Sequence, residues 1–240
     1  MGATVRMKRA VFFDLYGTLI DILTDEYDPS VYSALSRYLA YYLIKVPPEE
    51  FRKTYFEDIQ SHLKKSNESY PEVDVYEIIS NMMMRYGNKR YSKSIVAGTA
   101  KLFRSLTIRR FGVLPRAYGV LASLMGQCDL AIISDAQWVF AEPEMAMLGL
   151  RPFFNHCILS SRMGFKKPDV RLFKIAMGKL MAKPEESVYI GDNPQKDMVG
   201  AKMAGMKFIL FGPECRPYNH FEPDWCFNDY AELPKILEEL

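Results

Sequence analysis

Short apolar runs recur near the start of the chain and through its second half, and each is followed by a polar residue or by a turn. These runs occupy residues 10–13, 130–133, 157–159, 187–190 and 208–210. Short runs that are rich in β-branched and aromatic side chains and bounded by turn residues are typical of buried strands. We therefore predict that each run forms a strand.

Helical periodicity separates the strands of the second half. The predicted helices cover residues 115–125, 139–147, 169–180 and 197–204. Strands that alternate with helices of about ten residues favour a parallel sheet covered on both faces. The pattern thus predicts an α/β fold whose core is a Rossmann-like, doubly wound parallel sheet.

The segment between the first strand and residue 110 has the helical period alone. After Leu19 the strand pattern gives way to a helical one, and residues 24–109 contain no convincing strand. Apolar side chains recur along one side of residues 29–44, 51–63, 75–86 and 92–106. This spacing is typical of amphipathic helices. We predict an all-helical cap at residues 24–109, inserted into an α/β core formed by residues 1–23 and 110–240.

Composition narrows the classes of function. The 240 residues include 31 Lys and Arg against 29 Asp and Glu, so the net charge is +2, and no basic tract favours nucleic-acid binding. No apolar stretch approaches the ~18 residues of a membrane span, and Asp14 cuts short the apolar run behind the basic N-terminus, so no signal peptide is expected. Four cysteines without Cys-x-x-Cys spacing indicate neither zinc nor a redox motif. We expect a cytoplasmic protein with reduced cysteines, as a monomer or a homodimer.

Polar residues at the ends of three predicted strands are the first candidates for chemistry. Asp14 and Ser134 each follow an apolar run directly, and Asp192 follows the run 187–190 after Gly191. A carboxylate at the end of a buried strand is costly to desolvate unless a metal or hydrogen bonds compensate it. The carboxyl ends of parallel strands share one edge of the sheet, where ligands bind in open α/β folds. The three side chains can therefore meet in one crevice, although Asp14 could also cap its turn and Ser134 the helix after it.

A second acid and a lysine extend this group. Asp197 follows Asp192 by five residues, and Lys167 stands next to Pro168, whose rigid X-Pro step can hold it near the crevice. Converging carboxylates with no His or Cys among them suit a hard, oxygen-preferring ion, and Mg²⁺ is the usual one where phosphate is handled. The residues thus point to a magnesium site beside a possible anion site.

Four stretches together resemble the haloacid dehalogenase-like hydrolase superfamily, most of whose members are Mg²⁺-dependent phosphatases. They are Asp14-Leu15-Tyr16-Gly17-Thr18, Ile133-Ser134-Asp135, Gly164 to Asp169, and Gly191-Asp192 through Asp197 to Gly205. The helical insert between the first and second stretches also lies where that family has its small cap. The resemblance implies a hydrolase core with a cap domain and a small phosphorylated substrate, without nucleic acid or membrane as partner.

The resemblance assigns the reaction centre to the first and fourth stretches. It implies that Asp14 is the nucleophile and forms an aspartyl-phosphate intermediate. Asp14, the main-chain carbonyl of Tyr16 and Asp192 would bind Mg²⁺, with Asp197 supporting the metal site. The remaining residues would bind the substrate.

By the same resemblance, Ser134 and the backbone at Asp135 would hold the phosphoryl oxygens. Gly17 and Thr18 would line the same site. Lys167 would neutralise the charge that develops in the transition state, as positioned cations do in phosphoryl transfer.

Tyr16 departs from the phosphatase pattern. Phosphatases of the superfamily usually have a second Asp at this position, as general acid and base, whereas its metal-independent 2-haloacid dehalogenases have Tyr. Asp192 favours the phosphatase, because the dehalogenases have a Ser-rich, Asn-containing stretch in its place. Three functions therefore stay open: a Mg²⁺-dependent phosphatase, a 2-haloacid dehalogenase with the same Asp nucleophile, and a non-catalytic binding protein on the same fold.

Overall fold

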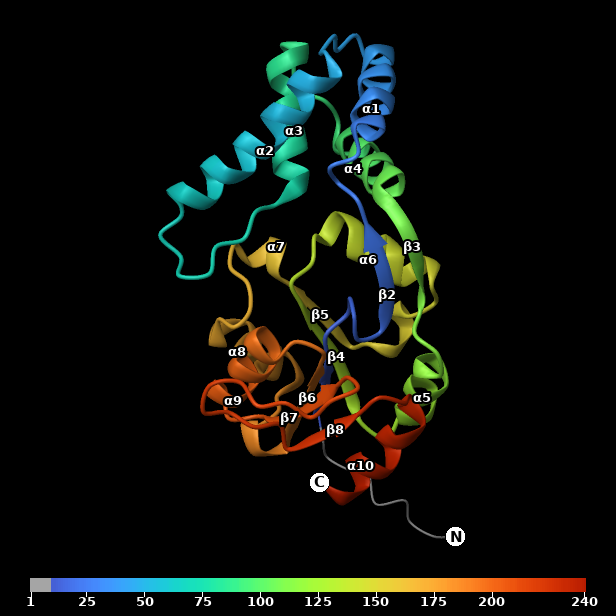
Figure 1. The fold of residues 1–240 in the computed structure, drawn as a ribbon, viewed down its shortest axis with the longest axis vertical. Helices are drawn as coiled ribbons and strands as arrows, with labels where there is room; N and C mark the ends of the chain where they lie inside the picture. Colours follow the sequence, from blue (N-terminus) through green and yellow to red (C-terminus); the bar gives the residue numbers. More distant parts are fainter. Residues whose placement is uncertain (1–9) are drawn as a thin grey trace.

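The five apolar runs and one further strand pair into a six-stranded parallel sheet in the computed structural model, which describes residues 10–240 (Figure 1). The strands are β1 (Ala10–Phe13), β4 (Asp129–Ser134), β5 (His156–Leu159), β6 (Ser187–Gly191), β7 (Lys207–Phe211) and β8 (Trp225–Phe227). Their order is β5-β4-β1-β6-β7-β8, so the chain leaves β1 in one direction and returns to build the other half of the sheet. The switch point lies at the carboxyl end of β1, which is where such sheets bind ligands.

Two hydrophobic clusters cover the sheet, because successive side chains of a strand point to opposite faces. Val11 and Phe13 of β1 pack on one face, and Ala10 and Phe12 pack on the other. The first face is covered by α5 (Ala117–Leu124), α6 (Trp138–Met147) and α10 (Leu233–Glu239). The second is covered by α8 (Val170–Leu180) and α9 (Val199–Met203). The predicted α/β class with a doubly wound parallel sheet is confirmed.

Short helical turns complete the core. They are α7 (Ser160–Met163), η1 (Arg151–Phe153), η2 (Pro184–Glu186), η4 (Tyr230–Glu232) and the π-helical η3 (Pro194–Met198). Where the sequence predicted one helix over residues 197–204, the structure has η3 followed by α9.

Four helices pack around a cluster of their own at the other end of the molecule (Figure 1). They are α1 (Pro29–Tyr41), α2 (Pro48–Lys65), α3 (Val75–Gly87) and α4 (Lys93–Thr107). Side-chain oxygens of Asp28, Asp74 and Ser92 accept from the first free N–H groups of α1, α3 and α4, which is why these helices begin where they do. Val139 and Phe140 of α6 join the same cluster, so the helical cap rests on the core.

A two-stranded antiparallel ribbon connects the core and the cap. It consists of β2 (Ile20–Thr24) and β3 (Ile108–Val113). The prediction that the chain turns helical directly after Leu19 is therefore wrong. The signal was weak because Arg110 and Asp21, exposed on the ribbon, replace the apolar side chains of a buried strand and pair with each other at 2.6 Å. The pattern also gave no sign of β8 or α10.

Residues 70–75, which lead into α3 and include its first residue, contact the core at a second place. We call them the docking segment. The Lys166 N–H donates to the Tyr70 carbonyl at 2.9 Å, and the Glu72 N–H donates to the Gly164 carbonyl at 3.0 Å. The side-chain amide of Gln137 donates to the Val73 carbonyl. Backbone hydrogen bonds thus fasten the cap to the loop around Gly164.

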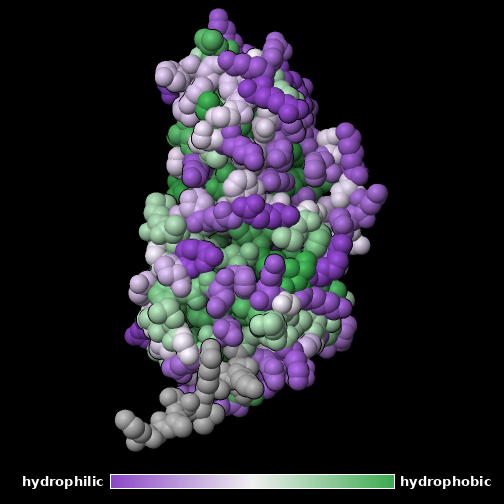
Figure 2. Space-filling view, turned by 180° about the vertical axis from the view of Figure 1, so that it is seen from behind, coloured by the Kyte–Doolittle hydropathy of each residue, from purple (hydrophilic) through white to green (hydrophobic). Residues whose placement is uncertain are grey.

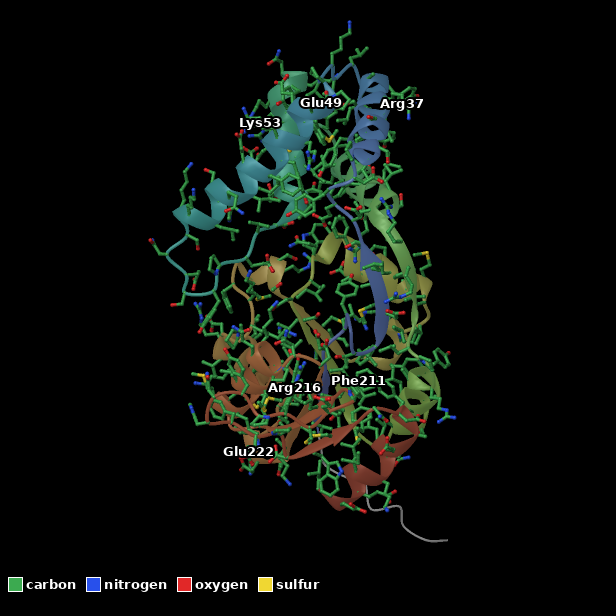
Figure 3. All side chains as sticks on the ribbon, viewed as in Figure 1. Arg37, Glu49, Lys53, Phe211, Arg216 and Glu222 are labelled. Carbon is green, nitrogen blue, oxygen red and sulfur yellow. A yellow bond between two sulfur atoms is a disulfide. The ribbon has the colours of Figure 1, made fainter. Side chains whose placement is uncertain are left out.

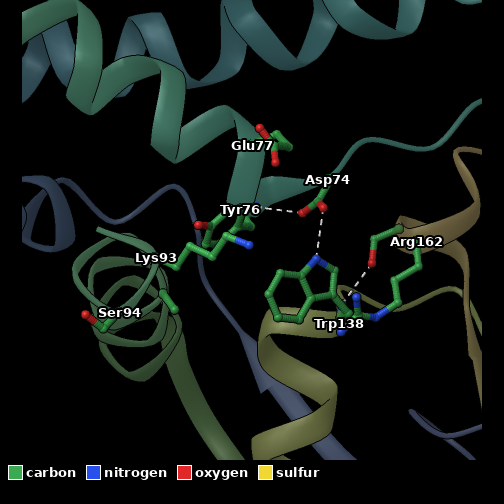
Figure 4. A pocket seen from close by; sticks show the side chains of 9 residues that line it. Asp74, Tyr76, Glu77, Lys93, Ser94, Trp138 and Arg162 are labelled. Atoms are coloured by element: carbon green, nitrogen blue, oxygen red, sulfur yellow. Dashed lines mark hydrogen bonds between the residues drawn. The ribbon is translucent and has the colours of Figure 1, made fainter. Parts of the chain in front are cut away.

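Trp138, which begins α6, is half-buried and lines a pocket where the docking segment meets the core (Figure 4). Its indole N–H donates to the Asp74 carboxylate at 2.9 Å. The Arg162 guanidinium lies over the indole ring, 4.2 Å from its centroid, and Tyr76 packs against the same ring. Cap and core therefore share an aromatic contact outside the ribbon.

Hydrophilic side chains cover most of the back of the molecule, and apolar residues show mainly near its middle, where cap and core meet (Figure 2). Arg37, Glu49 and Lys53 lie at the outer end of the cap, far from the sheet (Figure 3). Within residues 10–240, no helix combines the length and the apolar character that crossing a bilayer requires. The basic N-terminal residues 1–9, for which no signal peptide was expected, lie outside the described range.

Cys215 and Cys226 form a disulfide, so the expectation of reduced cysteines is wrong for this pair. Cys226 lies in β8 and Cys215 in the loop that follows β7. The eleven-residue separation matches no motif, because the pairing depends on the loop returning to the sheet and bringing the two Cα atoms to 5.5 Å.

Breaking this cross-link should destabilise the core. Loss of a disulfide that closes a loop of this size costs about 3 kcal/mol, which for a chain of this length corresponds to a fall in Tm of roughly 6–12 °C. The fall in Tm is measured by thermal unfolding of Cys226→Ser and Cys215→Ser, monitored by circular dichroism with and without dithiothreitol. Both variants should melt alike and ignore the reductant, whereas the wild type should respond to it. A wild-type Tm that reduction leaves unchanged would contradict the assignment.

Candidate active site

Three carboxylates meet at the carboxyl ends of β1 and β6. Asp14 follows β1, Asp192 follows β6, and Asp197 lies in η3; one oxygen of each lies within 4.8 Å of the others. Asp14 is 6% exposed and Asp197 is fully buried. The Asp14 N–H continues the ladder by donating to the Ile190 carbonyl at 2.9 Å. The crevice expected at the switch point of the sheet therefore contains all three predicted acids.

Lys167 reaches the same point from the loop before α8. Its Nζ lies 2.8 Å from Asp14 Oδ1 and 2.6 Å from Asp197 Oδ1, and the residue is 3% exposed. Lys167, rather than its neighbour Lys166, is thus the lysine that enters the site. The Lys167–Pro168 peptide bond is cis.

Tyr189 lies beneath this lysine and was not predicted as a site residue. Its hydroxyl accepts from Lys167 Nζ at 3.1 Å and donates to the Ile133 carbonyl at 2.8 Å. Because Tyr189 is part of the apolar run of β6, its polar end gave no separate signal in the sequence.

Asp192 and Asp197 differ in how their oxygens are used. Asp197 Oδ1 pairs with Lys167, and Asp197 Oδ2 accepts from the Asn193 N–H at 3.0 Å. Asp192 accepts a long hydrogen bond of 3.3 Å from the Thr18 hydroxyl. Asp192 is therefore the freer of the two to bind a further group, and Asp197 is the more firmly held.

Two glycines make the close approach of these acids possible. Gly17 has a φ of +86°, and a Cβ there would stand 2.6 Å from Asp192 Oδ2. A Cβ on Gly191 would overlap the Asp197 carboxylate. The first position also needs the left-handed backbone that glycine adopts without strain. Any larger residue at either position would displace an acid of the site.

The cluster has three carboxyl groups but one ammonium group. Burial raises the pKa of Asp197, and burial together with the Asp14 charge raises the pKa of Asp192. Burial alone would lower the pKa of Lys167, but the carboxylates of Asp14 and Asp197 outweigh it and raise this pKa, so the ammonium stays charged. Three carboxylates with one ammonium leave a net negative site.

A divalent cation would suit this donor set. All three donors are carboxylates, no His or Cys belongs to the cluster, and the excess negative charge is the kind that a hard cation relieves. Asp14 and Asp192 would hold the ion, since Asp197 already uses both oxygens.

The remaining predicted residues surround this cluster. Ser134 ends β4 and is almost fully buried. The Asp135 side chain accepts from the Lys167 N–H at 2.8 Å, and Lys196 Nζ lies 3.6 Å from its other oxygen, so it holds the lysine loop in place. Thr18 is buried with its hydroxyl toward Asp192. The structure thus brings Asp14, Lys167, Asp192 and Asp197 into contact.

Tyr16 directs its hydroxyl to a buried ion pair. The phenol donates to Glu144 Oε2 of α6, and Arg104 Nε of α4 lies 2.7 Å from Glu144 Oε1. The Arg104 guanidinium also lies over the Tyr16 ring. Burial, followed by the negative charge of Glu144, raises the pKa of Tyr16. Its hydroxyl therefore stays protonated and is occupied by Glu144. Neither Glu144 nor Arg104 was predicted, because nothing in their local sequence marks them.

A cleft of about 380 Å³ opens beside Tyr16, between the core and the cap. The core contributes Tyr16, Ile22, Asp135, Ala136, Gln137 and Phe140 among its lining residues. The cap side contributes Thr24, Glu26, Tyr55, Ile59, Val73, Val75 and Arg104. Since Tyr16 and Asp135 adjoin the loops of Asp14 and Ser134, the cleft lies next to the carboxylate cluster.

Comparison with known proteins identifies the family. A sequence model of the haloacid dehalogenase-like hydrolases matches residues 8–205. The chain belongs to this family. All four stretches that carried the resemblance lie within the matched range.

Two curated relatives and one solved structure illustrate the range of the family. The glyceraldehyde 3-phosphate phosphatase of Pyrococcus furiosus is 26% identical over 98% of this chain and 94% of that protein. The phosphoserine phosphatase of Thermus thermophilus is 32% identical over 52% of this chain and 51% of that protein. A 2-haloacid dehalogenase from Pseudomonas syringae has a TM-score of 0.65 at 21% identity, covering 97% of this chain and 99% of that one. At this identity the last likeness speaks for the fold alone.

The different use of Asp192 and Asp197 leads to a prediction about Mg²⁺. Asp192→Asn removes a charge without changing shape and should weaken Mg²⁺ binding by about 10- to 100-fold. Titration calorimetry with MgCl₂ alone measures the affinity. Glu214→Gln is the control, because Glu214 lines a small pocket with Asp192 but is exposed, and surface charge is screened. Unchanged affinity in Asp192→Asn would remove the metal site from this position.

Proposed function

We propose that the protein is a Mg²⁺-dependent phosphatase that hydrolyses a small phosphorylated substrate through an aspartyl-phosphate on Asp14. The observation that carries this proposal is the contact of Asp14 with Lys167 in a cluster that also contains Asp192 and Asp197. A nucleophile, a charged cation and an oxygen donor set for a metal are the parts that phosphoryl transfer needs. The phosphatase names of the relatives from Pyrococcus furiosus and Thermus thermophilus support it.

In the proposed reaction, an Asp14 carboxylate oxygen attacks phosphorus, and the bond from phosphorus to the leaving oxygen breaks. Lys167 lies against Asp14 and balances the negative charge of the phosphoryl oxygens. Ser134 and the backbone at Asp135 hold those oxygens. Water then cleaves the acyl phosphate and releases inorganic phosphate. Bound Mg²⁺ would supply further neutralisation of the phosphoryl charge.

Asp197 and Tyr189 act in this proposal as positioning residues. Asp197 binds Lys167 on one side, and the Tyr189 hydroxyl accepts from it on another, so the ammonium has few other orientations. The burial of all three keeps water from weakening these contacts.

Tyr16 favours a second candidate, the metal-independent 2-haloacid dehalogenase. Asp14 would then attack a carbon that carries halogen, and halide would leave. Asp192 speaks against it, because a half-buried carboxylate beside Asp14 adds repulsion unless a metal ion is bound. An activity screen of phosphate esters and short 2-haloacids, with and without Mg²⁺, separates the two reactions. Mg²⁺-dependent turnover of an aryl phosphate would also exclude a non-catalytic binding protein.

We also propose that residues 24–109 act as a cap domain on a core of residues 1–23 and 110–240. Both proposed boundaries fall within or next to the ribbon of β2 and β3. A cytoplasmic location is proposed as well, although the Cys215–Cys226 disulfide is rare in that compartment outside hyperthermophiles. Whether the protein is a monomer or a homodimer stays open.

Replacement of Asp14 tests the nucleophile. Asp14→Asn is nearly isosteric and should lower turnover by about 10³-fold or more, while Lys167 keeps its partner Asp197 and the fold survives. Steady-state phosphate release and circular dichroism measure the two effects. Asp21→Asn, the same change on the exposed ribbon, should retain activity. Substantial turnover by purified Asp14→Asn would contradict the assignment of Asp14 as the nucleophile.

Replacement of Tyr16 tests how the leaving group is protonated. General acid–base help is worth about 10² to 10⁴ in rate, and the Tyr16 phenol, occupied by Glu144, offers none. Alkyl phosphates should therefore react more slowly than aryl or acyl phosphates, whose leaving groups need little protonation. Tyr16→Asp should raise turnover of alkyl phosphates more than that of aryl phosphates.

Tyr16→Phe is the matched control, since it keeps the ring but removes the hydroxyl. It should leave the ratio of alkyl to aryl turnover unchanged. Rapid hydrolysis of an alkyl phosphate by the wild type, lost in Tyr16→Phe, would show that the phenol takes part in proton transfer.

A further inference from the structure

The charged side chains around the cleft between cap and core are mostly acidic. Among the described residues that line it, the charged ones are Glu26, Arg104 and Asp135. Asp135 is bound to the lysine loop and lies near Lys196. Arg104 is thus the one lining cation in the described chain that could meet a second anionic group of a substrate.

Arg104 already has a partner. Its Nε donates to Glu144 Oε1 at 2.7 Å and its Nη2 to Glu144 Oε2 at 3.4 Å. Both side chains are largely buried, with exposed fractions of 13% and 4%. Separating a buried ion pair leaves an uncompensated charge, which is strongly unfavourable. A substrate carboxylate or second phosphate would have to compete with Glu144 for this guanidinium.

Glu26 adds a carboxyl group to the same wall. Burial raises the pKa of this carboxyl group, while the positive charge of Arg104 and the hydrogen bond from the Tyr55 hydroxyl act in the opposite direction and favour the carboxylate. The Tyr32 hydroxyl donates to the Glu26 carbonyl at 2.7 Å, which holds the backbone of this residue. The Arg104 guanidinium thus lies near the carboxyl groups of both Glu144 and Glu26. Among the described residues that line the cleft, no cation is left unpaired.

The rest of the wall is apolar or carries hydroxyl groups. Ile22, Ile59, Val73, Val75 and Phe140 are its apolar members. Thr24 supplies a hydroxyl, whereas the Tyr55 hydroxyl is paired with Glu26 and the Gln137 amide with the backbone of Val73 and Val75. A volume of about 380 Å³ accommodates a small organic group, within the usual range for ligand sites.

We propose that this cleft binds an uncharged leaving group that carries hydroxyl or carbonyl oxygens, and that Glu26 makes the enzyme reject phosphate esters with a second anionic group. The inference rests on the proposed phosphatase function and adds its substrate class. A hydroxyl of the leaving group donates to the Glu26 carboxylate. A carboxylate in its place meets like charge in a partly desolvated cleft, without a free cation.

Matched substrates test the proposal directly. Glyceraldehyde 3-phosphate and 3-phosphoglycerate share a carbon skeleton and differ in an aldehyde against a carboxylate. Glycerol 3-phosphate, a second uncharged leaving group, completes the set. With Mg²⁺, the wild type should give kcat/KM at least about tenfold higher for both uncharged leaving groups than for 3-phosphoglycerate. This comparison needs no variant, so it does not depend on the folding of one.

Glu26→Gln keeps the size of the side chain and removes its charge. It should reduce the preference for glyceraldehyde 3-phosphate over 3-phosphoglycerate by about tenfold, mainly through KM. Glu49→Gln, at the outer end of the cap (Figure 3), is the control and should preserve the wild-type preference. Melting temperatures verify that both variants are folded.

The outcomes separate this inference from the function on which it rests. If the wild type releases phosphate from none of the esters, aryl phosphate included, the phosphatase proposal fails and this inference fails with it. If Mg²⁺-dependent turnover is present but 3-phosphoglycerate is hydrolysed as well as glyceraldehyde 3-phosphate, the substrate class alone is wrong. An unchanged preference in folded Glu26→Gln would likewise overturn the role of Glu26.

Discussion

The ammonium of Lys167, buried between Asp14 and Asp197, is the interaction on which the rest of the site depends. It joins the loop before α8 to the ends of β1 and η3, three segments far apart in the chain. Without it, Asp14 and Asp197 would be two buried carboxylates side by side, an arrangement that a folded protein tolerates only by protonating one of them or by binding a cation. Tyr189 and Asn193 complete the hydrogen bonds that make such a buried pair tolerable.

The same charge balance bears on how the site and the cleft would treat a charged ligand. One cation for three carboxylates leaves a negative site, so in the proposed reaction an anionic phosphate would need a bound divalent cation as well as Lys167. The cleft above repeats this pattern, since Arg104 is neutralised by Glu144. Among the described residues that line the cleft, Arg104 is the one cation and Glu144 already holds it, so the cleft offers mainly apolar and hydroxyl-bearing surface.

Much of this could be predicted from the sequence, because its strongest signals are local. The runs before Asp14, Ser134 and Asp192 mark strand ends, and a parallel sheet brings strand ends together. The ribbon of β2 and β3 escaped prediction because its exposed charged residues conceal the strand pattern. Tyr189, Glu144 and Arg104 escaped because a buried hydroxyl or ion pair is defined by contacts between distant segments. The Cys215–Cys226 disulfide escaped prediction as well, because it forms only where the loop after β7 returns to the sheet.

The docking segment has a mechanical consequence. The carbonyl of Tyr70 accepts from the N–H of Lys166, the residue directly before the lysine of the site. The next peptide N–H, that of Lys167, is bound to Asp135. A rotation of the cap about the ribbon would displace Tyr70 and break its hydrogen bond with Lys166. This is one of the two backbone N–H hydrogen bonds that hold the lysine loop, and with it the ammonium, close to Asp14. Opening of the cleft for a new substrate would then also loosen the contact of Lys167 with Asp14. The rate of amide hydrogen exchange at Lys166 would report how often this opening occurs.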